Sequence, residues 1–235
     1  SRQDQAAELY ELAGDACWRR ADFGEAYDHY QSAKEIISAG PAQAYLQVKI
    51  ARVLTTLYEP SACRDMLEQA GQTAERTALD WLMNTVFVTA AELSSVLGDD
   101  QSVDMWLERL EDCLPSMTQQ VSVLRLRARR TFRNGHLDDA YSLLQRAQKR
   151  TEHFGQREGL VGVLTDLGEV EDWRGHRPAA WNRLDRAMRL ARELSGRREL
   201  GEVLTRYGTT LRRAGETEEA TGLLGEALEI LSGGH

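Results

Sequence analysis

The sequence predicts an all-α fold, a right-handed α-solenoid of about six helical hairpins and therefore about twelve antiparallel helices. Three observations favour this fold. A four-residue skeleton returns every forty residues, the chain is rich in the helix formers Ala, Leu, Glu and Arg, and β-branched residues occur singly rather than in alternating runs. The three copies of the skeleton are Gly135, Ala140, Leu144 and Ala147; Gly175, Ala180, Leu184 and Ala187; and Gly215, Ala220, Leu224 and Ala227.

The repeat continues to the N-terminus in steps of 37 or 40 residues. One small residue recurs in every step, at Gly14, Ala51, Ala91, Ala128, Gly168 and Gly208. These positions divide the chain into six repeats, approximately 4–40, 41–77, 78–117, 118–156, 157–196 and 197–233. Because each repeat would bury the apolar faces of its neighbours, we expect one superhelical domain over residues 1–235.

Each repeat is predicted to be a pair of helices joined by a turn. The first helix has apolar residues at helical spacing, as in Val161, Leu164 and Leu167. A turn follows, as in "WRGHRP", and Pro60 and Pro178 suit the first turn of a second helix, where no backbone N–H is needed. The small residues of the second helix allow its neighbour to approach closely.

Composition and charge exclude several classes of protein. Apolar residues make up 42% of the chain and charged residues 28%, which is ordinary for a globular protein. A net charge of −8 argues against nucleic-acid binding, and no apolar run approaches the roughly 20 residues that cross a bilayer. Cys17, Cys63 and Cys113 are far apart and odd in number, which favours buried free thiols. We therefore expect a cytoplasmic protein that binds neither nucleic acid nor membranes.

The repeats resemble the tetratricopeptide repeat. "LTDLGEVEDWRGHRPAAWNRLDRA" matches that family's pattern through Leu164, Leu167, Gly168, Gly175, Ala180, Leu184 and Ala187, and "LYELAGDACWRRADFGEAYDHYQSA" matches it through Tyr10, Gly14, Ala26, Tyr30 and Ala33. Pro115 falls where the closing proline of the third repeat would stand. The period here is longer than the usual roughly 34 residues. Long-period arrays of this kind are similar to those appended to bacterial multidomain signalling regulators.

The resemblance implies that the first helix of each repeat lines a concave wall on which a protein or peptide binds. Carrying the wall positions across gives candidate partner-binding residues, namely Trp18, Arg52, Arg125, Arg129, Phe132, Arg133, Glu169 and Trp173. Exposed tryptophans are typical binding anchors, although a tryptophan on a helix is more often packed in a core.

Arg125, Arg129 and Arg133 are spaced four residues apart and therefore form one stripe on a helix. Two interpretations stay open. The stripe can be a solvated face that acidic neighbours partly neutralise. It can also anchor an acidic or phosphorylated peptide, because guanidinium groups bind carboxylates and phosphates with two hydrogen bonds. On the second interpretation, Arg129→Glu leaves the fold intact and weakens partner binding.

The sequence shows no catalytic motif, and we expect neither an enzyme nor a cofactor. It has no phosphate-binding Gly-Lys-Thr or Gly-Lys-Ser loop and no dinucleotide-binding fingerprint. His136 and His176 occupy equivalent turn positions, which repetition explains without a metal site.

The sequence therefore predicts a non-catalytic scaffold that binds a protein or peptide, with an acidic segment as one candidate partner. A regulatory role within a larger cytoplasmic bacterial signalling protein would follow from the resemblance. One alternative is self-association as a homodimer through the C-terminal helix, whose Leu224, Leu228 and Leu231 would otherwise lack cover. Another alternative is a sensor of a peptide or small molecule.

Overall fold

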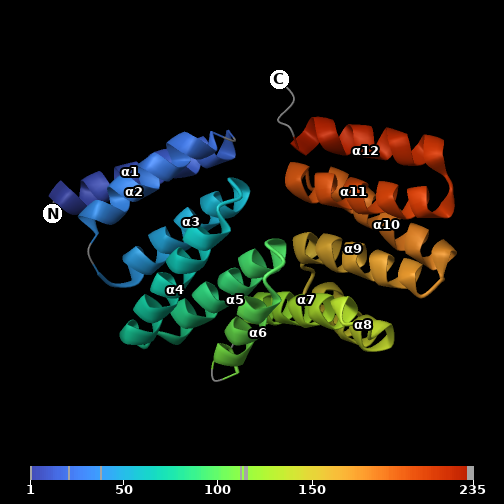
Figure 1. Cartoon of the computed structure of the whole chain (residues 1–235), viewed down its shortest axis with the longest axis horizontal. Helices are drawn as coiled ribbons and strands as arrows, with labels where there is room; N and C mark the ends of the chain where they lie inside the picture. Colours follow the sequence, from blue (N-terminus) through green and yellow to red (C-terminus); the bar gives the residue numbers. More distant parts are fainter. Residues whose placement is uncertain (1, 21, 38, 112, 114–115, 232–235) are drawn as a thin grey trace. The chain divides into compact units, whose positions relative to one another are not determined.

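The computed structural model describes residues 2–20, 22–37, 39–111, 113 and 116–231, apart from the side chains of Arg2 and Met117. Within these ranges the chain forms twelve α-helices and no β-strand (Figure 1). The chain divides into two compact units, residues 1–119 (unit 1) and residues 120–235 (unit 2). Pro115 lies outside the described residues. The predicted all-α fold of helical hairpins is confirmed, whereas one continuous domain over residues 1–235 stays a prediction.

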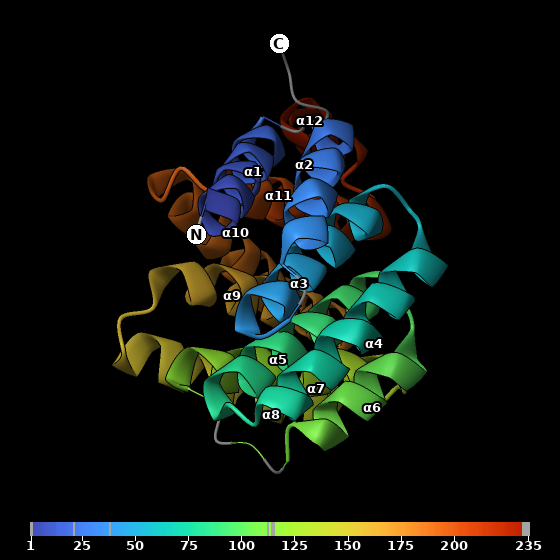
Figure 2. The same ribbon diagram turned by 90° about the vertical axis from the view of Figure 1, so that its left-hand side faces the viewer.

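Each unit is a short stack of hairpins. Unit 1 contains α1 (Arg2–Arg19), α2 (Phe23–Ile36), α3 (Pro41–Thr56), α4 (Pro60–Thr77), α5 (Asp80–Val96) and α6 (Asp100–Arg109). Unit 2 contains α7 (Met117–Arg133), whose first three residues belong to unit 1, α8 (Leu137–His153), α9 (Arg157–Trp173), α10 (Arg177–Glu193), α11 (Arg197–Ala214) and α12 (Thr217–Leu231). In unit 1, α1 packs on α2, α3 on α4 and α5 on α6, and Figure 2 shows α1 beside α2.

The two helices of a hairpin cross where the sequence has its recurring small residue. A Cβ atom added to Gly14 would stand 2.5 Å from Tyr30 Cε1, and one added to Gly208 would stand 2.7 Å from Leu224 Cγ. The alanines at the equivalent positions of the other repeats, such as Ala128, have no exposed surface. Small residues therefore recur because the facing side chain of the second helix fills the space that a larger residue would need.

The turns between the paired helices require a left-handed backbone conformation. The turn residue has a positive φ at Tyr58, Gly98, Gly135, Gly175 and Gly215, which are one repeat apart. Glycine adopts this conformation without strain, and Tyr58 is the exception, with φ of 58° and an exposed side chain. The turn of the second repeat therefore has the same backbone conformation without a glycine.

Neighbouring hairpins share apolar cores. In unit 2, Val121, Leu124 and Ala128 of α7 pack with Leu144 of α8 and Val163 of α9. A second cluster joins α9, α10 and α11 through residues such as Leu164, Ala187 and Val203. Each hairpin therefore buries its apolar faces against the next one, as the repeat pattern predicts.

The three cysteines are buried and free, as predicted. Burial raises the pKa of the Cys63 thiol, and the hydrogen bond with Thr55 opposes this effect. None of the described helices combines the length and the apolar character that spanning a membrane requires.

Ion pairs also link consecutive hairpins within each unit. In unit 1, Arg64 of α4 lies 2.7 Å from Asp99, the N-cap of α6. In unit 2, Arg186 of α10 lies 3.0 Å from Glu152 of α8, and Arg192 of α10 lies 2.9 Å from Glu226 of α12. The partners of each pair are 34 or 35 residues apart, close to one repeat.

Candidate functional site

The first helices of the three hairpins in unit 2 share one polar face, which we call the α7/α9/α11 face. Helix α9 packs directly on α11, and side-chain hydrogen bonds link α7 to both of them. The face consists of Arg125, Arg129 and Phe132 on α7, Asp166, Glu169, Asp172 and Trp173 on α9, and Glu202, Arg206 and Arg213 on α11. It includes five of the eight candidate partner-binding residues.

Asp166 is at the centre of the face and forms ion pairs with two of the arginines that were predicted to bind a partner. Arg125 Nε donates to Asp166 Oδ2 at 2.8 Å, and Arg129 donates to Asp166 Oδ1 from Nε at 3.0 Å and from Nη2 at 2.8 Å. The Asp166 side chain is only 4% exposed. The structure therefore brings Arg125 and Arg129 together, but around a carboxylate of the protein itself.

Gly162, one turn before Asp166, leaves room for this arrangement. A Cβ atom at residue 162 would stand 2.4 Å from Cζ of Arg125. The guanidinium group of Arg125 therefore lies directly over the backbone of α9, in the space that a side chain would occupy. Glycine at this position is explained by the close approach of Arg125.

The ionisation of Asp166 follows from its two partners. Burial alone would raise the pKa of the Asp166 carboxyl, but the charges and hydrogen bonds of Arg125 and Arg129 outweigh burial and lower it. Asp166 in turn raises the pKa of Arg129 against the opposing effect of burial. The lowered pKa keeps the Asp166 carboxyl ionised near neutral pH.

The ion-pair network continues across the face from α9 to α11. Arg129 Nη2 also donates to Glu202 Oε1 at 3.1 Å, and Arg206 pairs with Glu169. Burial raises the pKa of Glu169, and the positive charge of Arg206 only partly opposes this. Arg125 and Arg129 of α7 thus pair with carboxylates of α9 and α11, which compensates the positive stripe that α7 shows by itself.

An aromatic side chain stands exposed at one end of the face. Trp173 is 56% exposed and is held from two sides. The Phe132 ring meets it edge-on at 6.1 Å between centroids, and the Arg213 guanidinium lies 4.9 Å from its centroid. Arg213 is fixed in turn by Asp172, at 2.7 Å. The structure therefore holds the indole in place while leaving it open to solvent.

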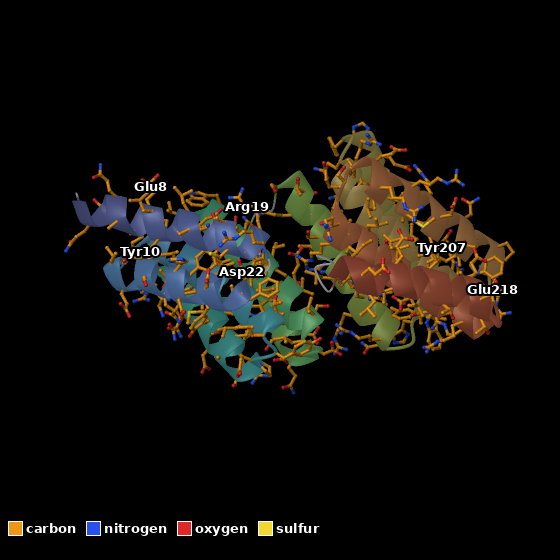
Figure 3. The ribbon with its side chains drawn as sticks, turned by 90° about the horizontal axis from the view of Figure 1, so that it is seen from above. Glu8, Tyr10, Arg19, Asp22, Tyr207 and Glu218 are labelled. Atoms are coloured by element: carbon orange, nitrogen blue, oxygen red, sulfur yellow. The ribbon has the colours of Figure 1, made fainter. Side chains whose placement is uncertain are left out.

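The other predicted residues lie apart from this cluster. Arg133 is exposed at the end of α7. In unit 1, Trp18 is half-buried and packs edge-on against Phe23 at 5.1 Å, whereas Arg52 on α3 is exposed. Figure 3 labels Glu8, Tyr10 and Arg19, which lie on the same helix, α1, as Trp18. Trp18 therefore offers less surface to a partner than Trp173.

Unit 1 has a charged cluster that the candidate residues did not include. Lys49 Nζ on α3 lies 2.6 Å from Glu11 Oε1 and 2.8 Å from Asp15 Oδ1, both on α1. Tyr30 donates its hydroxyl hydrogen to Asp15 at 2.7 Å, and burial raises the pKa of Tyr30. In unit 1 as in unit 2, the first helices of neighbouring hairpins are joined by charges of opposite sign.

Sequence reasoning missed Asp166 and Lys49 because it treated each helix separately. A usable signal exists in the repeat itself. Asp166 follows Arg129 by 37 residues and Arg125 by 41, and Lys49 follows Glu11 by 38, all close to one repeat. Opposite charges separated by one repeat on first helices therefore indicate pairs between hairpins.

The described residues contain no group of three or more His, Cys, Asp and Glu side chains that could hold a metal ion. His136 and His176 are the N-cap residues of α8 and α10, the equivalent turn positions expected from the repeat. The face is therefore an arrangement of paired charges around an exposed indole, which suits recognition of another molecule.

The chain is similar in fold to solved structures with tetratricopeptide repeats. A Rap protein complexed with competence and sporulation factor matches with a TM-score of 0.71 and 14% identity over 97% of this chain and 75% of that chain. A signal transduction ATPase with a tetratricopeptide repeat sensor from Pyrococcus horikoshii matches with a TM-score of 0.67 and 12% identity, over 97% of this chain and 39% of that chain.

The tetratricopeptide-like repeats of a kinesin light chain from Podosopora anserina match with a TM-score of 0.56 and 15% identity, over 81% of this chain and 95% of that chain. No protein-family model matches the sequence, and no curated protein is significantly similar to it. The chain therefore has the tetratricopeptide-repeat fold that its sequence resembles.

Proposed function

We propose that this chain is a non-catalytic scaffold that binds a protein or peptide, and that the α7/α9/α11 face makes the contact. The observation that carries the proposal is Trp173. A large aromatic side chain that is 56% exposed and already held by Phe132 and Arg213 loses little conformational freedom when a partner covers it.

The paired charges of the face support the same function. Arg125 and Arg129 form ion pairs with Asp166, so an acidic group of a partner would have to bind to other arginines. The network holds three helices at fixed spacing and leaves polar groups at the surface, which suits specificity more than bulk attraction. An acidic partner stays part of the proposal, but with its contacts away from the centre of the face.

A regulatory role in a larger cytoplasmic bacterial signalling protein is the finer part of the proposal. Support comes from the Pyrococcus horikoshii ATPase, in which tetratricopeptide repeats form the sensor, and from the Rap protein, which was crystallised with competence and sporulation factor. Both share the fold of this chain and little of its sequence.

A peptide-display selection on the intact chain tests the proposed function. Enriched peptides should bind in calorimetry, and Trp173→Ala should weaken them at least about tenfold, as expected for a tryptophan anchor. Trp81→Ala is the matched control, because Trp81 is 52% exposed on α5 and packs against another aromatic ring, that of Tyr45. The proposal fails if no selected peptide binds, or if the two variants bind equally well.

Self-association is the second candidate, and one observation favours it. Leu228 and Leu231 of α12 are 69% and 57% exposed, so the last described helix shows apolar surface to solvent. A homodimer through α12 would cover it. Light scattering of the intact protein and of Leu228→Glu during dilution separates the cases, because only a dimer through α12 would lose half its mass in the variant.

A further inference from the structure

We propose that a pocket at one end of the α7/α9/α11 face binds a carboxylate group that lies next to an apolar side chain of a peptide. The inference rests on the proposed function and names the chemistry of the partner. The pocket has a volume of about 400 Å³ and is lined by Asp172, Trp173, Gly175, Arg177 and Arg213. A space of this size accepts one or two side chains rather than a folded domain.

The floor of the pocket combines an ion pair with an aromatic ring. Arg213 pairs with Asp172, whose side chain is only 6% exposed, and stacks on the indole of Trp173. The positive charge of Arg213 therefore offsets the negative charge of Asp172, so that Asp172 repels an incoming carboxylate only weakly. The open surface of the indole is available for an apolar side chain of the ligand.

The rim of the pocket carries a positive charge that the protein does not use. Arg177 is the first residue of α10 and is exposed. Among the residues that the structure describes, its guanidinium group has no hydrogen-bond or ion-pair partner, unlike those of Arg125, Arg129 and Arg213. A guanidinium group prefers planar anions that accept two parallel hydrogen bonds, and a carboxylate is one of them.

The combination occurs in only one of the three hairpins of unit 2. The positions equivalent to Trp173 hold Arg133 and Arg213, and the positions equivalent to Arg177 hold Leu137 and Thr217. Structural repetition therefore does not explain why an exposed indole and an uncompensated arginine stand on the same pocket. We infer that the pair has a binding role.

Three acetylated five-residue peptides test the inference with the intact chain. The first ends in Leu-Phe with a free carboxylate, the second is its C-terminal amide, and the third is an amide with Glu before the Leu-Phe. At least one acidic peptide should bind about tenfold more tightly than the neutral amide, as one charge-assisted contact would give. The first and third peptides distinguish a chain-terminal carboxylate from a side-chain carboxylate.

Two pairs of variants locate the binding. Arg177→Glu and Trp173→Ala should each weaken binding of the acidic peptide about tenfold or more. Arg177→Glu should do so with unchanged thermal unfolding, because its side chain is exposed. Arg197→Glu is the matched control for the first, since Arg197 is the exposed first residue of α11 and does not line the pocket. Trp81→Ala is the control for the second.

Several outcomes would overturn the inference. Equal affinity for the acidic peptides and the neutral amide would show that the carboxylate is not recognised. Equal effects of Arg177→Glu and Arg197→Glu would show that the peptide does not bind in this pocket. Displacement by equimolar inorganic phosphate would indicate a general anion site instead. If display-selected peptides depend on Trp173 but not on Arg177 or on a carboxylate, this inference fails while the proposed function stands.

Discussion

Gly168 on α9 faces Leu184 on α10 so closely that a Cβ atom on the glycine would stand 2.5 Å from Cγ of the leucine. Leu184 has no exposed surface and is packed on all sides. The contact defines how far apart the two helices of this hairpin lie, and the pairs Gly14–Tyr30 and Gly208–Leu224 repeat it.

Gly168→Ala should therefore destabilise the protein, by about 1–3 kcal/mol, because the buried leucine has no free space to move into. Gly225→Ala is the matched control, since Gly225 also lies inside a helix but an added Cβ would meet nothing within 4 Å. The control should gain about 0.5–1 kcal/mol from helix propensity. Urea unfolding measures both values, and a stabilised Gly168→Ala protein would show that the hairpin can widen freely.

Tyr58→Gly should stabilise the turn between α3 and α4. Tyr58 holds φ at 58° with its side chain 86% exposed, so the substitution removes backbone strain and loses little packing. Left-handed backbone costs a residue with a Cβ atom about 1–2 kcal/mol, and the greater freedom of glycine in the unfolded chain offsets part of the gain. The net gain should be a few tenths to about 1 kcal/mol.

The reverse substitution at the equivalent turn provides the comparison. Gly98→Ala places a Cβ atom at φ of 73° and should cost about 1 kcal/mol in thermal or urea unfolding. If Tyr58→Gly and Gly98→Ala change the free energy of unfolding in the same direction, the left-handed conformation of the turn does not determine their effects.

Asp166→Ala should cost about 3 kcal/mol, because it leaves the two partly buried guanidinium groups of Arg125 and Arg129 without their shared carboxylate. Replacing all three residues, as Asp166→Leu with Arg125→Met and Arg129→Met, should recover most of the loss, since a buried ion cluster and an apolar substitute are often nearly equal in stability. Urea unfolding of both proteins gives the values. An unchanged free energy of unfolding in Asp166→Ala would mean that solvent already screens the charges of the cluster.

The structure changes what we expect of Arg129→Glu. From the sequence this substitution leaves the fold intact, but it would place a second carboxylate against buried Asp166. We now expect Arg129→Glu to lower the thermal unfolding temperature by itself. Loss of binding in that variant would therefore not identify a contact with a partner, whereas Arg177→Glu leaves the cluster untouched.

Stability should fall in acid, and Asp166 should account for part of the loss. Arg125 and Arg129 hold its pKa below 3.8, the ordinary value for an aspartate, so the unfolded chain binds more protons than the folded one in this range. The stabilisation is therefore fully present above about pH 4 and disappears as the pH falls through the lower pKa of the folded protein.

Urea midpoints measured from pH 7 to pH 2 test this dependence. Asp166→Asn should flatten the curve below about pH 4 and leave its shape at higher pH unchanged. Glu169, whose pKa burial raises, acts with the opposite sign, since its contribution decreases as the pH rises above 4.5. An acid slope that is the same in Asp166→Asn and the original protein would assign the loss to other carboxylates, such as Asp15.

The sequence predicted the hairpins well because their determinants recur. The small crossing residues, the glycine turns and Pro60 and Pro178 at the starts of second helices all lie where the repeat places them. The short helix α6, with 10 residues, was not foreseen, because Ala91 and Gly98 mark where the two helices pair and not where the second one ends.

The site was predicted only in part, for a physical reason. Spacing along α7 shows that Arg125 and Arg129 share a stripe, but it does not show that α9 places Asp166 between them. The resemblance also assigned both Trp18 and Trp173 to the concave wall, although one is half-buried by Phe23 and the other is exposed. Exposure depends on the neighbouring helix, which periodicity within one helix does not describe.

The ion pairs between consecutive hairpins have a consequence for how such a protein can evolve. Arg64, Arg186 and Arg192 each depend on a carboxylate that only one neighbouring hairpin supplies. A duplicated or transplanted hairpin would keep its apolar contacts and lose its electrostatic match. The charges of each hairpin thus match those of its own neighbours. A chain with its hairpins in another order would fold, but the hairpins would stack less tightly.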